Sequence, residues 1–204
     1  MTRPDEAQSV QHARLKLAFL FLAPAAVVLL ATLMFYSGIG IPRGTTNKGT
    51  LVQPPRPLDE LQLRAVDGAP WRYEGAKRGW GMLIAGGAEC DLDCRARITL
   101  MRQVRSALGQ DAGRLHRYYL AIDGLPGASL ATFLASEHPD MQLIQTNRSA
   151  LLALLARPGD AEPISSGAVY LVDPRGFAMM VYLPAHPDRA VLDDLRFLLR
   201  NSPD

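Results

Sequence analysis

The stretch WGMLIAGGAECDLDCRARITLMRQVRSAL, residues 80–108, decides the fold, because it passes from one structural pattern to another. Trp80 to Ala85 is a short, continuous apolar run of the kind that forms a buried strand. From residue 94 to residue 108, apolar side chains recur at helical spacing, which predicts an amphipathic helix. The stretch therefore predicts a buried strand that leads into a helix.

The two cysteines of this 204-residue chain, Cys90 and Cys94, lie at that junction. If Cys94 is in the first turn of the helix and Cys90 just before it, the unpaired N–H groups and the helix dipole favour a thiolate at Cys90. Residues four apart across such a junction can also bring their Cα atoms within disulfide range. We interpret them as a redox pair, with a metal site, a structural staple or two inert thiols as alternatives.

Three carboxylates flank the pair: Glu89, Asp91 and Asp93. Like-charge repulsion disfavours a thiolate, so these residues argue against a fast oxidant. They would instead favour an incoming cation or simply cap the helix, and the sequence leaves both roles open.

The composition indicates a folded protein that does not bind nucleic acid. Hydrophobic residues make up 48% of the chain and charged residues 21%, which is typical of globular proteins. The formal net charge is +2, and the basic residues are scattered rather than gathered into one basic face. An even number of cysteines permits a disulfide in an oxidising compartment without requiring one.

The N-terminal region predicts a membrane anchor. No charged residue occurs from Leu17 to Ile41, and at about 1.5 Å per residue this run exceeds a hydrocarbon core of roughly 30 Å. It is too long for a cleaved secretory signal and lacks a small-x-small site after it. Arg3, Arg14 and Lys16 precede the run more densely than basic residues follow it, which favours a cytoplasmic N-terminus.

Four segments are therefore expected along the chain. Residues 1–16 would be cytoplasmic, residues 17–41 would form the transmembrane helix, and residues 58–204 would form a periplasmic domain. Residues 42–57, with prolines clustered near their end, would form a tether between anchor and domain.

Strand and helix patterns alternate through the expected domain. The pattern begins with a hairpin, in which residues 61–65 alternate and Asp67-Gly68 turns the chain toward Trp71 and Tyr73. After residue 108 we expect a strand at 117–123, a helix at 129–138 capped by Ser129, a strand at 141–145, a helix at 149–156, an antiparallel hairpin at 168–183 and a helix at 187–200. This order predicts an α/β domain with a mixed central sheet, which is the order of the thioredoxin fold, after one transmembrane helix.

Two motifs, CDLDC at residues 90–94 and VYLVDPRGF at residues 169–177, follow the anchor, tether and hairpin. Together these features resemble the Sco/SenC family over roughly Leu58 to Arg200. Members of that family are membrane-anchored, thioredoxin-fold copper proteins that help to assemble the copper centre of cytochrome c oxidase subunit II. The resemblance implies that Cys90 and Cys94 are both a redox pair and two thiolate ligands of copper.

The chain departs from the family pattern at two places. The family has a histidine ligand a few residues before the second motif, where this chain has ISSGA at residues 164–168, and it has a proline after the second cysteine, where this chain has Arg95. The chain's own histidines are His12, His116, His138 and His186. His12 precedes the membrane span and the others are expected at the surface, with His186 the best remaining candidate. Two thiolates without a nitrogen ligand suit Cu(I) rather than Cu(II).

The favoured function is that of an accessory protein of cytochrome c oxidase assembly in the inner membrane. It would act by thiol–disulfide exchange, by Cu(I) handling, or by both, on subunit II or with other assembly factors, and would not be a metabolic enzyme. Cys90 would be the nucleophile and Cys94 the resolving thiol. One alternative is a non-catalytic Sco-like scaffold with an inert or structural cysteine pair. Another is a thiol peroxidase or general disulfide reductase, for which Arg95 and Arg97 would supply positive charge.

Overall fold

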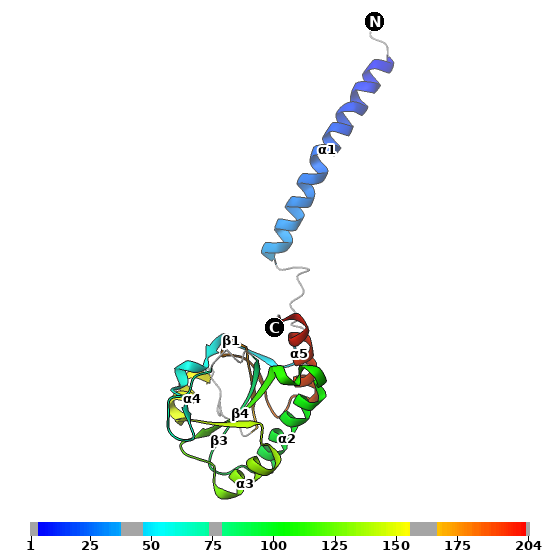
Figure 1. The fold of residues 1–204 in the computed structure, drawn as a ribbon. Coiled ribbons are helices and arrows are strands. Elements are labelled where there is room, and N and C mark those ends of the chain that lie inside the picture. Colours follow the sequence, from blue (N-terminus) through cyan, green and yellow to red (C-terminus); the bar gives the residue numbers. More distant parts are fainter. Residues whose placement is uncertain (1–3, 38–46, 74–78, 156–166, 203–204) are drawn as a thin grey trace. The chain divides into compact units, whose positions relative to one another are not determined.

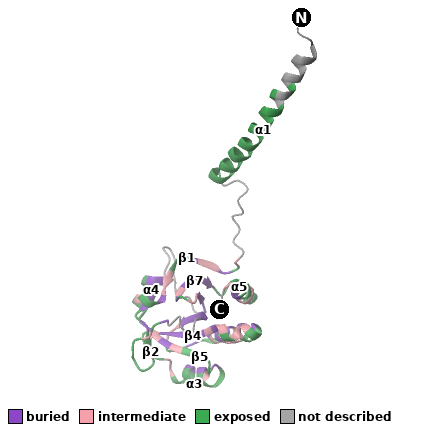
Figure 2. Ribbon diagram, turned by 45° about the horizontal axis from the view of Figure 1, so that its top comes forward, coloured by how far each residue is buried: buried purple, intermediate pink, exposed green. Residues whose placement is uncertain are grey.

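The computed structural model describes residues 4–37, 47–73, 79–155 and 167–202. The chain forms two compact units, Met1–Thr46 and Asn47–Asp204. The first unit contains one helix, α1 (Pro4–Ser37), drawn in blue in Figure 1. The side chains described in this helix are all exposed, as its green colour in Figure 2 shows.

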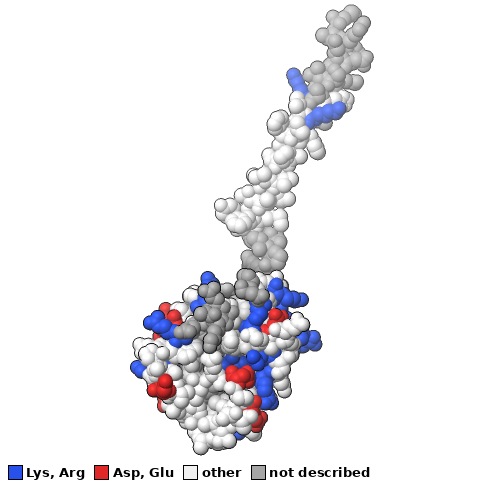
Figure 3. All heavy atoms as spheres, in the orientation of Figure 1, with Lys and Arg blue, Asp and Glu red and all other residues white. Residues whose placement is uncertain are grey.

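Helix α1 is long and apolar enough to span a membrane from Lys16 to Ser37. Basic side chains, Arg14 and Lys16, lie where this span begins, and the surface from there to Ser37 is free of charged side chains (Figure 3). An exposed apolar surface of this length is expected of a helix that contacts lipid rather than water. The part of the predicted span from Leu17 to Ser37 is therefore helical, and residues 38–41 lie outside the described residues.

The second unit is built on a seven-stranded mixed sheet of order β1-β7-β6-β3-β4-β5-β2. The strands are β1 (Thr50–Pro57), β2 (Arg64–Ala65), β3 (Trp80–Gly86), β4 (Leu115–Ile122), β5 (Met141–Thr146), β6 (Val169–Val172) and β7 (Phe177–Tyr182). Strands β3, β4 and β5 run parallel, and β6 pairs antiparallel with both β3 and β7. The carboxyl ends of β3 and β4 therefore lie on the same side of the sheet.

Helices cover both faces of this sheet (Figures 1 and 2). They are α2 (Leu92–Ala107), α3 (Ala128–Glu137), α4 (Arg148–Leu155) and α5 (Asp188–Asn201), with short 3₁₀ helices η1 (Leu58–Leu61) and η3 (Gly109–Arg114). Residues of α2, α3 and α5 share one buried cluster with alternate residues of β3 and β4, and residues of α4 and η1 share the other. Along β3, for example, Met82 and Ile84 belong to the first cluster and Leu83 and Ala85 to the second. This alternation is what a strand buried on both faces requires.

The structure confirms the predicted α/β fold with its mixed sheet and the antiparallel hairpin of β6 and β7. It also confirms the buried strand and the helix of residues 80–108, which form β3 and α2. From β3 onward each predicted strand or helix is present, and its ends move by only a few residues.

One prediction about the tether was wrong, because residues 50–57 form the edge strand β1 rather than a free linker. Thr50 pairs with Val181 and Arg56 with Ala178 of β7, and the register shifts between Leu51 and Arg56. Val52 contributes to the buried core. Proline is tolerated in edge strands and at irregular pairings, because one side of such a strand needs no hydrogen-bond donors.

Two local predictions also need correction. The hairpin before β3 is reduced to a turn at Asp67-Gly68 with an isolated bridge between Arg64 and Pro70, because β2 pairs with β5 instead. Helix α3 begins at Ala128 after Gly127, so Ser129 is not its cap. The hydroxyl oxygen of Ser129 instead accepts a hydrogen bond from Arg95 at 2.9 Å.

Candidate redox site

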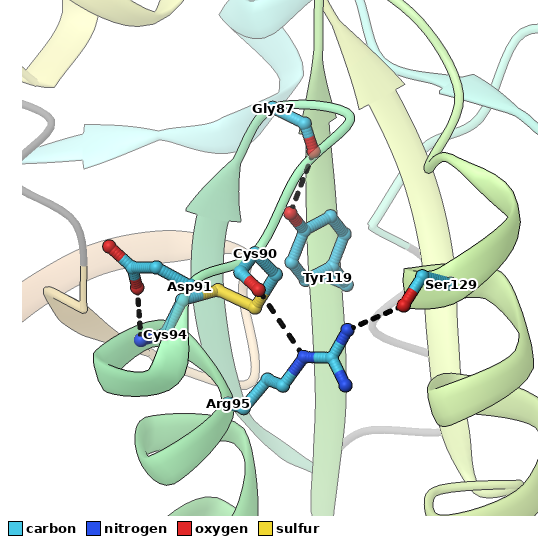
Figure 4. Close-up of a disulfide and its surroundings, with 7 residues drawn as sticks. All are labelled: Gly87, Cys90, Asp91, Cys94, Arg95, Tyr119 and Ser129. Carbon is cyan, nitrogen blue, oxygen red and sulfur yellow. Dashed lines mark hydrogen bonds between the residues drawn. A yellow bond between two sulfur atoms is a disulfide. The ribbon is translucent and has the colours of Figure 1, made fainter.

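Cys90 and Cys94 form a disulfide at the junction of β3 and α2, with their Cα atoms 5.4 Å apart (Figure 4). Cys90 lies one residue before the helix cap, and Cys94 lies in the first turn of α2. This places the pair at the N-terminus of the helix, where the helix dipole favours a thiolate. The structure thus brings the two predicted site residues together.

Asp91 caps the helix that carries Cys94. Its carboxylate accepts a hydrogen bond from the backbone N–H of Cys94 at 2.8 Å. Of the two roles that the sequence left open for the acidic residues, the structure therefore gives Asp91 the helix-capping one. Glu89 and Asp93 are exposed, and among the described residues neither forms an ion pair.

Hydrogen bonds to three of its backbone carbonyls hold the loop before α2 in place. The Tyr119 hydroxyl donates to Gly87 O at 2.9 Å, the Gly127 N–H donates to Ala88 O at 2.8 Å, and Arg95 Nε donates to Cys90 O at 3.3 Å. Burial raises the pKa of Tyr119 to about 12, so its hydroxyl remains a donor at physiological pH. Because these contacts come from β4, the loop after it, and α2, they fix the loop from three directions.

Arg95, at the position where the Sco/SenC pattern has proline, links α2 to α3. Besides Cys90 O, its guanidinium contacts Ser129 Oγ at 2.9 Å and lies 5.0 Å from the centre of the Phe133 ring. In Figure 4 the side chain runs from the first turn of α2 past Cys90 toward Ser129. A proline at this position could make none of these contacts, since they all use the guanidinium.

The disulfide lies at the rim of the core. Cys90 is 8% exposed and Cys94 5%, so exposure does not distinguish a nucleophile from a resolving thiol. Between them Leu92 is 84% exposed, and Glu89, Asp91 and Asp93 are exposed around it. A client that reached the sulfurs would therefore meet a carboxylate-rich surface with one prominent leucine.

Among the residues that the structure describes, the histidines do not complete a metal site. Both ring nitrogens of His186 have partners, because Nδ1 accepts from Leu183 N at 3.0 Å and Nε2 lies 3.3 Å from Thr50 Oγ1. His138 was expected at the surface, but it is buried at the C-terminal end of α3 and its ring packs against Phe133. Within the part of the chain that the structure describes, no three His, Cys, Asp or Glu side chains are grouped to hold a metal ion. Residues 164–166, where the Sco/SenC pattern has its histidine, lie outside that part.

Sequence reasoning missed several residues that shape the site: Tyr119, Ser129, Phe133 and Gly127. The pair Gly86-Gly87 was an available signal, since glycines after a buried strand often mark a close backbone approach. A Cβ at Gly86 would lie 2.3 Å from the Tyr119 hydroxyl, so that approach requires glycine. The contacts of Arg95 had no signal in sequence spacing, because they depend on how α2 and α3 pack.

Comparison with known families agrees with this architecture. Residues 80–202 match the family described as "Transmembrane-like, thioredoxin-like, C-terminal domain". The match covers more than half of the chain. The chain belongs to this family. A search of curated proteins found no sequence match.

Solved structures similar to this transmembrane-like, thioredoxin-like protein include two Sco proteins. Copper-bound yeast Sco1 is 15% identical with a TM-score of 0.54, and the match covers 78% of this chain and 97% of the yeast chain. Apo Sco1 from Thermus thermophilus is 16% identical with a TM-score of 0.53, covering 76% and 99%. An uncharacterised thioredoxin-like protein from Porphyromonas gingivalis is 11% identical with a TM-score of 0.54, covering 71% and 93%. At these identities the likeness establishes the shared fold, and a place among divergent Sco proteins stays a prediction.

Proposed function

We propose that this protein is a membrane-anchored thiol–disulfide exchange protein that serves the assembly of cytochrome c oxidase, with the copper-site apoprotein of subunit II as its client. The observation that carries this proposal is the cysteine pair at the start of α2, on a loop whose carbonyls are held by three neighbouring elements. A fixed loop keeps the two sulfurs within reach of each other after reduction, which exchange requires. The Sco-like fold favours this client over others.

The exchange step uses only the two cysteines of this chain. The Cys90 thiolate attacks one sulfur of the client disulfide, and the other client sulfur leaves as a thiolate. Cys94 then loses its proton to that leaving thiolate and attacks Cys90 Sγ, which re-forms the Cys90–Cys94 bond and releases the second client thiolate. Two electrons pass to the client, and a dithiol protein donor must return two electrons to this chain before the next cycle.

Copper does not fit the oxidised pair, because neither sulfur in a disulfide is a thiolate. After reduction, Cys90 and Cys94 would supply two thiolates, a donor set that Cu(I) accepts and Cu(II) does not prefer. Cu(I) handling is therefore the second candidate function. We would titrate the reduced full chain with Cu(I) against a competing chelator without oxygen, beside a Cys90→Ser, Cys94→Ser double variant. One tightly bound equivalent that the double variant loses supports Cu(I) handling, and equal binding by both proteins contradicts it.

The proposed location is the inner membrane, with residues 1–16 in the cytoplasm and the domain in the periplasm. The apolar surface of α1 from Leu17 to Ser37 and the denser basic residues before Leu17 support this arrangement. The tether expected over residues 42–57 is shorter than predicted, because the second unit begins at Asn47 and includes β1. After mild reduction of intact cells, a membrane-impermeant thiol reagent should label Cys90 and Cys94. Labelling that requires cell lysis would contradict the periplasmic placement.

The test of the exchange function uses the reduced full chain in detergent and oxidised subunit II apoprotein. We expect client thiols to appear at a rate that depends on this protein, as measured by alkylation and mass spectrometry. Cys94→Ser should accumulate a mixed disulfide between Cys90 and the client, and Cys90→Ser should not. Client reduction that is no faster with the wild-type chain than with the double serine variant would leave a scaffold with a structural disulfide. Trapping by Cys90→Ser alone would reverse the two roles.

A further inference from the structure

Arg95 holds a charged group against the cysteine loop through neutral partners. Its guanidinium donates to Cys90 O and to Ser129 Oγ and lies over the Phe133 ring. These contacts fix where the guanidinium sits without neutralising it, since a carbonyl, a hydroxyl and an aromatic face carry no net charge. Among the described residues, no carboxylate forms an ion pair with Arg95.

Arg97, two residues further along α2, is the informative contrast. Its guanidinium pairs with Asp188 at 3.0 Å and donates to Pro184 O at 2.8 Å, so its charge is directed to the start of α5 and balanced there. From the sequence, both arginines are candidate sources of positive charge near the cysteines. The geometry separates them, because only Arg95 contacts the cysteine loop and keeps its charge unpaired.

We propose that Arg95 is a positioning residue that stabilises the thiolate formed at Cys90 when the disulfide is reduced, and so sets how readily the pair accepts electrons. The proposal rests on the pair being redox-active, as the proposed function requires. It adds a residue that the Sco/SenC pattern does not supply, because that pattern has proline at this position.

The physical reason lies in the charge change on reduction. The disulfide carries no charge, and two electrons with one proton convert it into one thiol and one thiolate. A dithiol supplies those electrons and becomes a disulfide. The negative charge that appears is attracted by a fixed cation beside Cys90, and the attraction is only partly screened, because both cysteines are largely buried and Arg95 is half-buried. Asp91 and the exposed Glu89 and Asp93 act in the opposite direction, so Arg95 offsets the repulsion that the sequence predicts.

The test compares full-length variants in lipid nanodiscs after circular dichroism has confirmed that each is folded. Arg95→Met removes the charge and keeps most of the side-chain length, Arg95→Lys keeps the charge, and Arg97→Met is the matched control. Each protein is equilibrated with mixtures of reduced and oxidised dithiothreitol, and the fraction reduced gives the equilibrium constant. Thiolate absorbance at different pH values gives a second, independent readout.

We expect Arg95→Met to lower the equilibrium constant for reduction about tenfold, which corresponds to about 30 mV for a two-electron couple. The thiolate should also appear at higher pH in this variant. Arg95→Lys should change the constant less than about threefold, because the charge remains, and Arg97→Met should match the wild type. Arg95→Met values within twofold of the wild type, or an equal change in Arg97→Met, would overturn the proposal. These measurements need no client, so their outcome is separate from that of the exchange test.

Discussion

At the scale of single residues, the most buried charged side chain among the described residues is that of Arg117, near the start of β4. Its side chain is 0% exposed, and it donates to both carboxylate oxygens of Asp140. Its Nη1 atom also lies 3.4 Å from Ile98 O and 3.4 Å from Nδ1 of the buried His138. The pairing with Asp140 makes this buried arginine tolerable, because an unpaired charge in the core would cost several kcal/mol.

His138 gives this cluster a pH dependence. Burial lowers the pKa of His138 below its ordinary value of 6.5, and the positive charges of Arg117 and Arg102 lower it further against the opposing effect of Glu137 and Asp140. Between the folded-state pKa and pH 6.5, the unfolded chain therefore binds a proton at His138 that the folded chain does not bind. Stability from this residue is complete above pH 6.5 and is lost as the pH falls toward the folded-state pKa.

The prediction is that the free energy of unfolding falls below pH 6.5 with a slope of up to about 1.4 kcal/mol per pH unit from this one proton. His138→Leu should remove that part of the slope, as measured by urea unfolding from pH 7.5 to pH 5. Arg117 lowers the pKa of Asp140 below 3.8, so the stability from Asp140 is lost in a separate, lower pH range. An unchanged slope in His138→Leu would contradict this assignment.

The same scale shows where sequence reasoning stops. Spacing located Cys90 and Cys94 correctly at the start of a helix, since the apolar periods on either side define that junction. Spacing did not locate His138 in the core, because its burial depends on Phe133 and Arg117 from other elements. Long-range partners of polar side chains are set by packing, which local periodicity does not encode.

At the scale of elements, the attachment of β1 depends on one carboxylate of α5. Asp194 is 6% exposed and accepts hydrogen bonds from Lys48 N, Gly49 N and the Tyr182 hydroxyl, each between 2.9 and 3.0 Å. Burial and the neighbouring Asp194 charge raise the pKa of Tyr182, so its hydroxyl stays a donor. A side chain at Gly49 would lie 2.6 Å from the Tyr182 ring, so this position needs glycine.

We predict that Asp194→Ala lowers the free energy of unfolding by about 3 kcal/mol, because three donors, of which those of Gly49 and Tyr182 are buried, lose a charged acceptor. Both tryptophans lie in the second unit, so their fluorescence during urea unfolding reports on this domain alone. Asp193→Ala is the control, since that carboxylate pairs with Lys48 and Arg189 at the surface and should contribute far less. Equal losses in the two variants would show that Asp194 does not fix β1.

Element types were largely predictable from sequence, and element partners were not. Residues 80–108 and the pair of strands around Pro174-Arg175-Gly176 have strong periodicity and turn chemistry, and they fold as expected. Residues 50–57 have the proline-rich composition that is typical of a linker. Their place in the sheet follows only from the pairing of β1 with β7. Strand order is a tertiary property, so a short edge strand with prolines gives little local warning.

At the scale of the whole molecule, the chain joins a lipid-compatible helix to a thioredoxin-like domain whose cysteines are bonded. The apolar run predicted the helix because hydrocarbon thickness sets a minimum length. The alternation of strands and helices predicted the domain because each element must bury an apolar face. The function is less predictable, since it depends on whether the pair opens, and the same fold can carry an active or an inert disulfide.

The most direct measurement is therefore the redox equilibrium of the full chain in lipid nanodiscs. Thiol alkylation would give the fraction of Cys90 and Cys94 reduced across a series of dithiothreitol ratios, and circular dichroism would show whether the reduced protein stays folded. We predict half-reduction at a potential above about −300 mV with the fold intact, because an exchange protein must open its disulfide under cellular conditions. A pair that stays oxidised below about −300 mV, or that opens only when the domain unfolds, would be a structural staple and would contradict the proposed exchange function.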